Sequence, residues 1–180
     1  MNDESSFSKK KLTSSGFTLS FIARDFSLYS MFNIVMVHPE IPHNTGAAGR
    51  LALATGATLH LIEPLGFEIN DKAVKRAGLD YWKDVSVKTW RSWEEFEENL
   101  ADDARLFMLT TKSDQPYWDK KFIAGDYLVF GRETKGLDED LIKKYGENAI
   151  TIPMTSGSTR SLNLATSIGI VLYEAVRQVS

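Results

Sequence analysis

Short apolar runs alternate with amphipathic stretches from Phe32 to the end of the chain, and this alternation restricts the fold more than any other sequence feature. Several runs are apolar throughout, which is typical of strands with both faces covered, and the stretches between them suit crossover helices. The sequence therefore predicts an α/β fold with a parallel sheet. The expected strands span residues 32–37, 58–62, 85–89, 105–110, 127–130 and 149–152, and the expected helices span residues 45–54, 71–77, 93–99, 139–144 and 163–178.

The first 30 residues differ from the rest of the chain. They are rich in serine, contain three consecutive lysines at positions 9–11 and lack a sustained helix or strand period. We expect a flexible N-terminal extension over residues 1–30 and a single domain over residues 31–180, with Met31 as an alternative start of the native protein. Thr18 and Ser20 interrupt the apolar stretch at 17–23, which disfavours a secretory signal peptide.

Composition limits the chemistry that the chain can carry. It has no cysteine and only three histidines, which excludes disulfides, zinc–thiolate sites and cysteine nucleophiles and leaves little for a metal site. No run approaches the roughly 20 apolar residues of a membrane-spanning helix. The net charge of -3 disfavours nucleic-acid binding on average, but residues 94–103 alone hold six acidic side chains and no basic one. The remaining chain is therefore positive, and a basic face for nucleic acid stays open.

In open parallel sheets, ligands bind beyond the carboxyl ends of the strands, so the segments after the strands are candidate sites. The first segment, residues 38–50, leads into a helix that Asn44 is placed to cap. Arg50 lies six residues later and follows small residues at 46–49, which would let a ligand or another chain approach closely. This pattern fits a functional arginine and an ordinary surface arginine equally well.

The second segment, residues 130–137, and the third, residues 152–163, also follow predicted strands. Glycines in the second permit positive φ angles and a close approach of a ligand to the backbone, although a plain strand-to-helix turn has the same composition. Ser161 or Asn163 could cap the last helix, and the third segment could also hold an anion. Dinucleotide, P-loop and nucleophile-elbow spacings are missing, so the residues alone predict three polar loops at one sheet edge.

Together these segments resemble the motifs of the SPOUT (trefoil-knotted) RNA 2'-O-methyltransferases, with the greatest similarity to the TrmL branch (YibK/CspR), which modifies the wobble nucleotide of transfer RNA. The resemblance covers residues 31–178; Ala47-Ala48-Gly49 departs from the bulkier apolar residues usual there, and the N-terminal extension is foreign to the family. The shared motifs are Pro39-Glu40-Ile41-Pro42 with Asn44-Thr45-Gly46 and Arg50, Ile62-Glu63-Pro64-Leu65-Gly66-Phe67, Arg76-Ala77-Gly78-Leu79-Asp80-Tyr81, Phe130-Gly131-Arg132-Glu133-Thr134 with Gly136-Leu137, Ile152-Pro153-Met154, and Arg160-Ser161-Leu162-Asn163-Leu164.

The resemblance implies S-adenosylmethionine-dependent 2'-O-methylation of tRNA nucleotide 34, a cytidine or modified uridine, with tRNA-Leu as the expected substrate. It also implies a C-terminal trefoil knot, the tRNA anticodon stem-loop as partner, no metal and a cytoplasmic location. Arg50 would be catalytic, Asn44 would shape the same loop, and Gly131 would leave room for the adenosine. Positions matching the cofactor contacts are Leu109, Gly131, Glu133, Ile152, Met154, Ser161, Leu162 and Asn163, and weaker candidate RNA contacts are Arg76, Arg132 and Arg160.

A homodimer is implied as well, because the catalytic arginine of this family commonly serves the partner subunit's cofactor. We expect the dimer to form through an apolar stripe on the last helix, although the same stripe would also suit an intramolecular core. The stripe consists of Leu164, Ile168, Val171, Leu172 and Ala175.

Alternative functions remain open at this point. The same fold and chemistry could act on ribosomal RNA or on another tRNA position, although the lack of an additional RNA-binding domain argues mildly against this. A nonenzymatic RNA-binding module with a vestigial cofactor site would share the fold, but Gly131, Ser161, Asn163 and Arg50 are all present. A dehydrogenase with a dinucleotide cofactor is remote, because the glycine fingerprint is missing.

Overall fold

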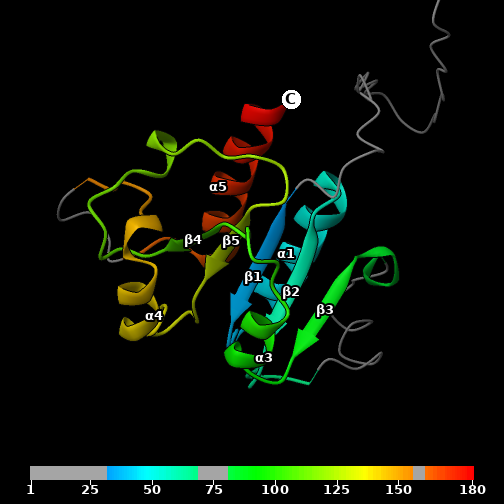
Figure 1. Cartoon of the computed structure of the whole chain (residues 1–180). Coiled ribbons are helices and arrows are strands. Elements are labelled where there is room, and N and C mark those ends of the chain that lie inside the picture. Colours follow the sequence, from blue (N-terminus) through cyan, green and yellow to red (C-terminus); the bar gives the residue numbers. More distant parts are fainter. Residues whose placement is uncertain (1–31, 69–80, 156–160) are drawn as a thin grey trace, which may run out of the picture.

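The computed structural model describes residues 32–68, 81–155 and 161–180. Within these ranges six strands form one sheet in the order β3-β2-β1-β5-β4-β6, and every neighbouring pair is parallel (Figure 1). The α/β class and the parallel sheet predicted from the apolar runs are confirmed. The strands are β1 (Asn33–Val37), β2 (Thr58–Ile62), β3 (Val87–Trp90), β4 (Leu106–Leu109), β5 (Tyr127–Phe130) and β6 (Ala149–Ile150).

Four of the six strands differ from the prediction at their ends, β1 and β4 by one residue at an end and β3 and β6 by up to two, whereas β2 and β5 have the predicted bounds. β3 begins two residues late because the N–H of Val85 donates to the carbonyl of Trp82 and so closes a short helical turn. β6 ends two residues early because the N–H of Thr151 donates to the Gln115 carbonyl, which lies outside the named strands. A local turn therefore delays β3, whereas β6 ends where its chain pairs with a distant segment.

The helices are α1 (Pro42–Thr55), α3 (Trp93–Glu98), α4 (Glu139–Lys144) and α5 (Leu164–Val179), with 3-10 turns η1 (Trp82–Asp84), η2 (Tyr117–Asp119) and η3 (Gly146–Asn148). The helix predicted at residues 71–77 lies outside the described residues. None of the helices in the described ranges is long and apolar enough to cross a membrane.

The two long helices begin in different ways. Asn163 caps α5 as predicted, because its side-chain oxygen accepts a hydrogen bond of 3.1 Å from the Thr166 N–H. The capping role predicted for Asn44 is wrong, because α1 begins three residues earlier than predicted, with Ile41 at the N-cap position. Pro42 favours this early start, since its ring fixes φ and it has no N–H to leave unpaired.

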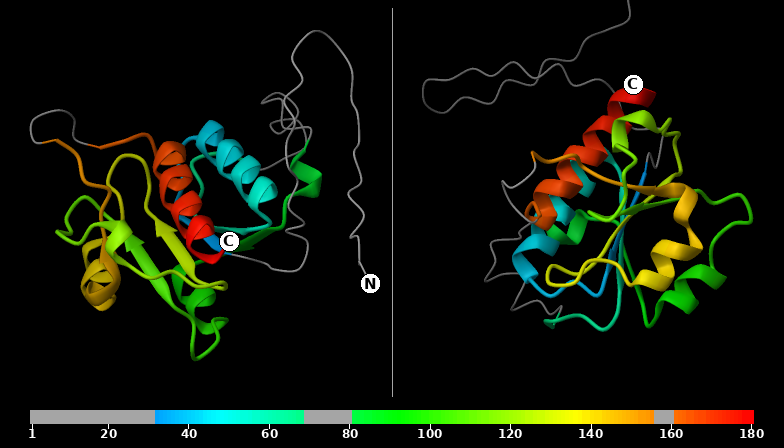
Figure 2. Two further views of the ribbon diagram at one scale, coloured as in Figure 1. Left: turned by 90° about the horizontal axis from the view of Figure 1, so that it is seen from above. Right: turned by 90° about the vertical axis from the view of Figure 1, so that its left-hand side faces the viewer.

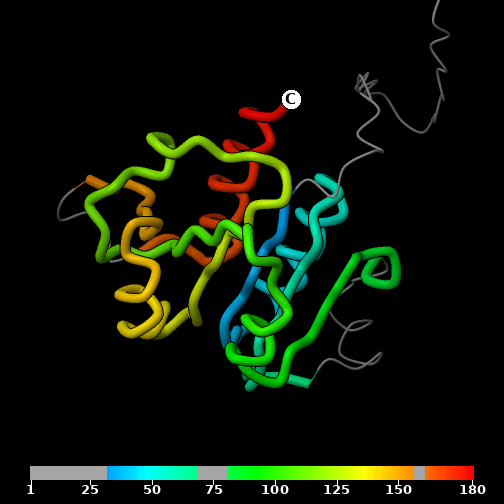
Figure 3. The backbone as a smooth tube through the Cα atoms, in the orientation of Figure 1, coloured from blue at the N-terminus to red at the C-terminus, as the bar shows by residue number. Residues whose placement is uncertain are grey.

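Helices α1 and α5 cover one face of the sheet, and α3 and α4 cover the other (Figure 2). Along β1, Ile34 and Met36 pack into the cluster on the α1 and α5 side, while Val35 and Val37 pack into the cluster on the opposite side. Figure 3 shows β1 between β2 and β5, although β5 follows it only much later in the chain. Burial on both faces explains why residues 34–37 of this strand are all apolar.

The stripe predicted as a dimer interface belongs to the chain's own core. Ile168, Val171, Leu172 and Ala175 are fully buried, and Leu164 packs against the same cluster, so this prediction is wrong. Helical periodicity identifies an apolar face but not what covers it, and here the chain's own sheet covers it. The large apolar side chain that α5 leaves exposed is Tyr173, at 51%.

A buried histidine lies on the α3 side of the sheet. His60 accepts a hydrogen bond at Nδ1 from the indole N–H of Trp90 (3.1 Å), and its Nε2 lies 3.1 Å from Oδ1 of Asn33, so Nε2 carries the proton. Burial, and to a lesser extent the charge of Lys88, lower the pKa of His60 to about 4. This histidine is therefore a neutral core residue at pH 7.

Candidate functional site

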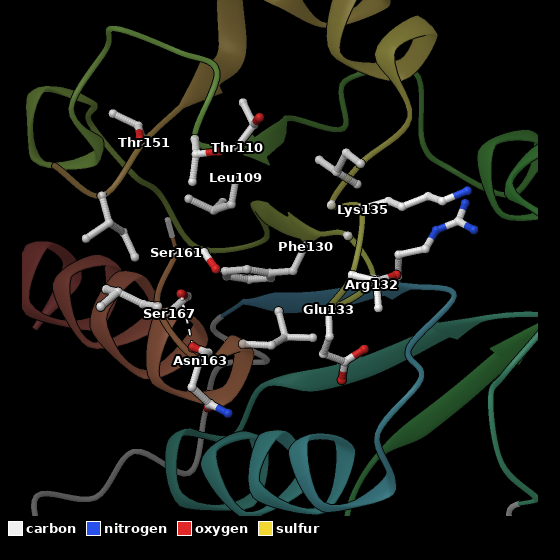
Figure 4. A pocket seen from close by; sticks show the side chains of 18 of the residues that line it. Leu109, Thr110, Phe130, Arg132, Glu133, Lys135, Thr151, Ser161, Asn163 and Ser167 are labelled. Atoms are coloured by element: carbon white, nitrogen blue, oxygen red, sulfur yellow. Dashed lines mark hydrogen bonds between the residues drawn. The ribbon is translucent and has the colours of Figure 1, made fainter. Parts of the chain in front are cut away.

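A cavity of about 530 Å³ lies at the carboxyl edge of the sheet. Its walls are the segments that follow β4, β5 and β6, together with the starts of α5 and α1 (Figure 4). The three polar loops predicted to share one sheet edge therefore meet around one cavity. All eight positions predicted for the cofactor line it, as do Asn44 and Arg132; the eight are Leu109, Gly131, Glu133, Ile152, Met154, Ser161, Leu162 and Asn163.

The cavity combines apolar walls with a few polar groups. Figure 4 shows Leu109 and Phe130 reaching it from β4 and β5, while Ser161 and Asn163 come from the start of α5. Its volume falls in the range of about 300–1,000 Å³ that is usual for small-molecule sites, and the mixed lining is usual as well. Among the described residues, no group of three or more histidine or carboxylate side chains is arranged to hold a metal ion.

The loop after β5 folds tightly back on itself. The N–H of Gly136 donates to the carbonyl of Arg132 (2.9 Å), and Gly136 has a φ of +72°. A Cβ at Gly131 would overlap the backbone of Gly136 and Leu137. Gly131 was predicted to leave room for a ligand. The structure shows that the backbone of the loop itself already requires glycine at this position.

Glu133 holds this loop to the start of α1. Its carboxylate accepts hydrogen bonds from the backbone N–H groups of Glu40 (2.8 Å) and Ile41 (3.2 Å) and from the side-chain amide of Asn44 (2.8 Å). In Figure 4 the carboxylate points toward α1, away from Leu109. A negative charge at this end of the helix is electrostatically favourable. The direct cofactor contact predicted for Glu133 stays a prediction.

A second carboxylate makes the reverse connection. The Glu40 side chain accepts hydrogen bonds from the backbone N–H (3.1 Å) and the hydroxyl (3.0 Å) of Thr134. Each loop therefore supplies a carboxylate to backbone donors of the other, and we call this pair of contacts the loop clasp. The loop clasp fixes the segment after β1 against the segment after β5. Its acceptors are ionised carboxylates, and hydrogen bonds to ionised groups are stronger than hydrogen bonds between neutral groups.

Asn44 joins the loop clasp to the third loop. The side chain is only 3% exposed; its Nδ2 donates to Glu133, and its Oδ1 accepts from Nδ2 of Asn163 (3.0 Å). Asn163 in turn caps α5 through its own Oδ1, which accepts from the Thr166 N–H. One buried amide therefore connects all three loops that the sequence pointed to.

Arg50, the predicted catalytic residue, is not among the residues that line the cavity. It is exposed on α1, six residues after Asn44, which places it roughly 240° further round the helix. Its guanidinium carbon lies 4.6 Å from the centroid of the Tyr81 ring. Asn44 and Arg50, which were predicted to act in the same loop, are therefore presented on different sides of α1.

Of the three arginines predicted to contact RNA, the structure describes Arg132. Arg132 lines the cavity and forms an ion pair with Asp138 (3.3 Å), and Figure 4 shows its guanidinium on the same side as Lys135. Arg76 and Arg160 lie outside the described residues. The cavity thus has cations at its edge, of which Arg132 already has an acidic partner.

Sequence reasoning missed the residues that support the candidate site. Glu40, Thr134 and Tyr81 stand within the quoted motifs, but nothing in their spacing says what they contact. Their partners lie far along the chain: 94 residues separate Glu40 from Thr134. The one signal in the sequence was that Glu40 and Glu133 stand in loops at the same sheet edge. Each carboxylate needs hydrogen-bond donors when the two loops approach each other.

Comparison with known proteins agrees with this architecture. The model of the SpoU rRNA Methylase family matches residues 31–173. The tRNA (cytidine(34)-2'-O)-methyltransferase of Burkholderia ambifaria is 45% identical over 150 residues, covering 82% of this chain and 96% of the relative. The tRNA (cytidine(34)-2'-O)-methyltransferase of Aeromonas hydrophila is 47% identical over 150 residues, covering 83% of this chain and 95% of the relative.

A solved structure described as "Structural insights into the 2-OH methylation of C/U34 on tRNA" is 42% identical, with a TM-score of 0.77 over 82% of this chain and 95% of that one. The sheet and the cavity define a parallel α/β protein with a cavity of small-molecule size at its carboxyl edge. The chain belongs to the SpoU rRNA Methylase family, because the family model spans most of its length and relatives of this identity cover more than two thirds of it.

Proposed function

We propose that this protein is a methyltransferase that uses S-adenosylmethionine to methylate the ribose 2'-oxygen of nucleotide 34 in tRNA. The observation that carries the proposal is the cavity at the sheet edge, because every position matched to a cofactor contact lines it. The names of relatives at 45–47% identity support the substrate. The family's own name refers to ribosomal RNA, which keeps that substrate as the alternative.

The cavity suits S-adenosylmethionine in its mixture of surfaces. Apolar side chains such as Leu109, Ile152 and Leu162 would pack against the adenine, and the loop after β5 would offer backbone groups to the ribose. The loop clasp and Asn44 would keep these walls in place before the cofactor arrives. When bound, the cofactor supplies an electrophilic methyl group on its sulfonium.

Arg50 would act on the ribose of the RNA. Methyl transfer is an in-line displacement in which negative charge develops on the 2'-oxygen as its proton leaves. A guanidinium keeps its protons near neutral pH and is a poor base, so Arg50 would instead stabilise the developing oxyanion and hold an adjacent phosphate. The proton would pass to that phosphate or to water.

A second copy of the chain would complete the site. Arg50 is exposed and does not line the cavity of its own chain, so the proposed chemistry requires that it reach another cavity. The outer surfaces of α1 and α5 offer an interface, because each leaves a large apolar side chain exposed: Leu53 is 41% exposed and Tyr173 is 51% exposed. This surface replaces the buried stripe as the proposed dimer interface, and a monomer in sedimentation would contradict it.

The recognition of tRNA and the location follow from the same proposal. A small subunit would read the anticodon stem-loop by its shape and its unstacked bases, with Arg132 as one candidate phosphate contact. A tRNA-modifying enzyme is expected in the cytoplasm. tRNA-Leu remains the expected isoacceptor.

The test is transfer of labelled methyl groups from S-adenosylmethionine to total tRNA from a strain lacking this gene, followed by nucleoside mapping. We expect a 2'-O-methylated pyrimidine at position 34 that is lost in Arg50→Ala. Incorporation at another position would keep the chemistry and change the substrate. Activity on ribosomal RNA alone would favour the alternative, and a protein that binds no S-adenosylmethionine would refute the proposal.

The shared site has its own test. Arg50→Ala and Asn163→Ala would each impair a different half of the proposed site, so a mixture of the two inactive proteins should regain activity after subunit exchange. In a heterodimer, the Arg50→Ala subunit would supply an intact cavity and the Asn163→Ala subunit would supply Arg50, so one of the two sites would be complete. A mixture that stays inactive although sedimentation shows exchange would contradict the shared site.

A further inference from the structure

The segment that begins at Tyr81 is fastened to α1 at two points. The Tyr81 hydroxyl donates a hydrogen bond of 2.8 Å to the carbonyl of Gly46. Close by, the indole of Trp82 packs on Gly49, where an added Cβ would lie 2.6 Å from Cζ3. Gly49 is one of the small residues that depart from the usual family pattern, and this contact gives it a structural reason.

The Tyr81 ring, oriented in this way, lies beneath the side chain of Arg50. The guanidinium carbon is 4.6 Å from the ring centroid, which is a favourable cation–π distance. A guanidinium carries five N–H donors, and an aromatic ring attracts its charge without supplying a conventional hydrogen-bond acceptor, so those donors stay available. Within the described residues no hydrogen bond or ion pair of Arg50 is found, and the ring is its defined contact.

We propose that Tyr81 positions Arg50 for methyl transfer, holding the guanidinium over its ring so that the N–H donors meet the reacting ribose and its phosphate. The inference rests on the function proposed for Arg50. Tyr81 touches the arginine and not the reacting atoms, so it is a positioning residue. An exposed arginine without such support samples many rotamers, and only a fraction of them suit the reaction.

The size and kind of the effect follow from this role. If the free energy of a cation–π contact is lost in the transition state, the rate falls roughly 3- to 30-fold. The loss should fall on kcat, because the cavity that would bind the cofactor is built by other residues. The dissociation constant of S-adenosylmethionine should therefore stay unchanged.

The experiment compares Tyr81→Leu, Tyr81→Phe and a matched control, Tyr145→Leu. Tyr145 also has a cation over its ring (Lys144, 5.6 Å), and its hydroxyl donates to Glu97, but it lies on the α4 side of the sheet. We expect Y81L to lower kcat roughly 3- to 30-fold, Y81F to stay within about threefold of wild type, and Y145L to keep the wild-type kcat. Thermal unfolding and S-adenosylmethionine titration accompany each variant, and Y81M replaces Y81L if the latter does not fold.

A double-mutant comparison separates positioning from general damage. If Tyr81 acts through Arg50, then Y81L should cause no further loss of the residual single-turnover rate that R50A retains with excess enzyme. An equal loss in both backgrounds, a wild-type kcat for Y81L, or a loss in Y81F as large as in Y81L would overturn the inference. A wild-type protein that transfers no methyl group to RNA would refute the proposed function instead, so the two failures are distinguishable.

Discussion

The cavity and the surface around Arg50 are built in different ways. Around the cavity, polar groups 89 to 119 residues apart in the chain hydrogen-bond to one another through the nearly buried Asn44. Arg50 is exposed and is supported by one aromatic ring. The chain therefore preforms the binding part of the proposed site, while the reacting cation stays accessible to another molecule. A preformed cavity costs little ordering when the ligand arrives, and an open cation can serve a second subunit.

The largest effect that would sharpen this comparison is on Arg50. Arg50→Lys keeps the charge but loses the planar set of donors and the stack on Tyr81, so kcat should fall by about 100-fold or more. S-adenosylmethionine affinity, measured by calorimetry, should not change. Near-full kcat in the lysine variant would show that charge alone suffices, and the geometric role given to Arg50 would then be wrong.

A smaller effect is expected at Gly131 on the cavity side. Gly131→Ala places a methyl group in the backbone of residues 136–137, which should lower the free energy of unfolding by about 1–3 kcal/mol and weaken cofactor binding. Denaturant unfolding and calorimetry measure the two. Gly146→Ala is the control, because a Cβ at Gly146 meets nothing within 4 Å. Equal behaviour of the two alanine variants would contradict the close packing of this loop.

Asn44→Ala should have a moderate effect on the same side. It removes one of the three donors to the Glu133 carboxylate and the acceptor of the Asn163 side-chain amide, which should lower the free energy of unfolding by about 1–2 kcal/mol and weaken cofactor binding. Asn99→Ala is the comparison, since that amide makes one exposed hydrogen bond to the Glu95 carbonyl. If both substitutions had the same small effect, the amide would not be the link between the loops.

The smallest effect concerns acid, and it belongs to neither region. The pKa of His60 is about 4 in the folded protein and 6.5 when unfolded, so the unfolded chain binds more protons between these values. Its contribution is fully present above pH 6.5 and is lost as the pH falls toward 4, by about 1 kcal/mol between pH 6.5 and 5.5. Urea unfolding at several pH values measures this slope. His60→Gln should flatten it, and an unchanged slope would assign the acid sensitivity elsewhere.

The sequence predicted those parts of the fold that depend on local pattern. β2 and β5 have their predicted bounds because short, largely apolar segments of that length are typical of buried strands. Asn163 was a candidate cap because the asparagine precedes an apolar helical period. The cavity was predicted at the carboxyl ends of the strands by a topological rule, and the resemblance then matched eight positions that line it.

Other features depend on contacts that spacing does not contain. α1 begins at Pro42, directly after Ile41. The backbone N–H of Ile41 donates to the carboxylate of Glu133, which lies 92 residues away in the chain. The stripe on α5 shows the same limit, since Val171 would be equally apolar beneath a sheet or against a second subunit. Gly131 was singled out correctly as a position that requires glycine, but for a different reason. The sequence does not show that a side chain there would collide with the backbone of Leu137. The trefoil knot stays a prediction from the family.

The buried amide of Asn44 has an evolutionary consequence. Its nitrogen faces a carboxylate acceptor on Glu133, and its oxygen faces an amide donor on Asn163, so the two ends cannot be exchanged. An aspartate at position 44 would set a second negative charge against Glu133. Substitutions at these three positions are therefore expected to arise together or not at all, and their covariation among related sequences would record the network.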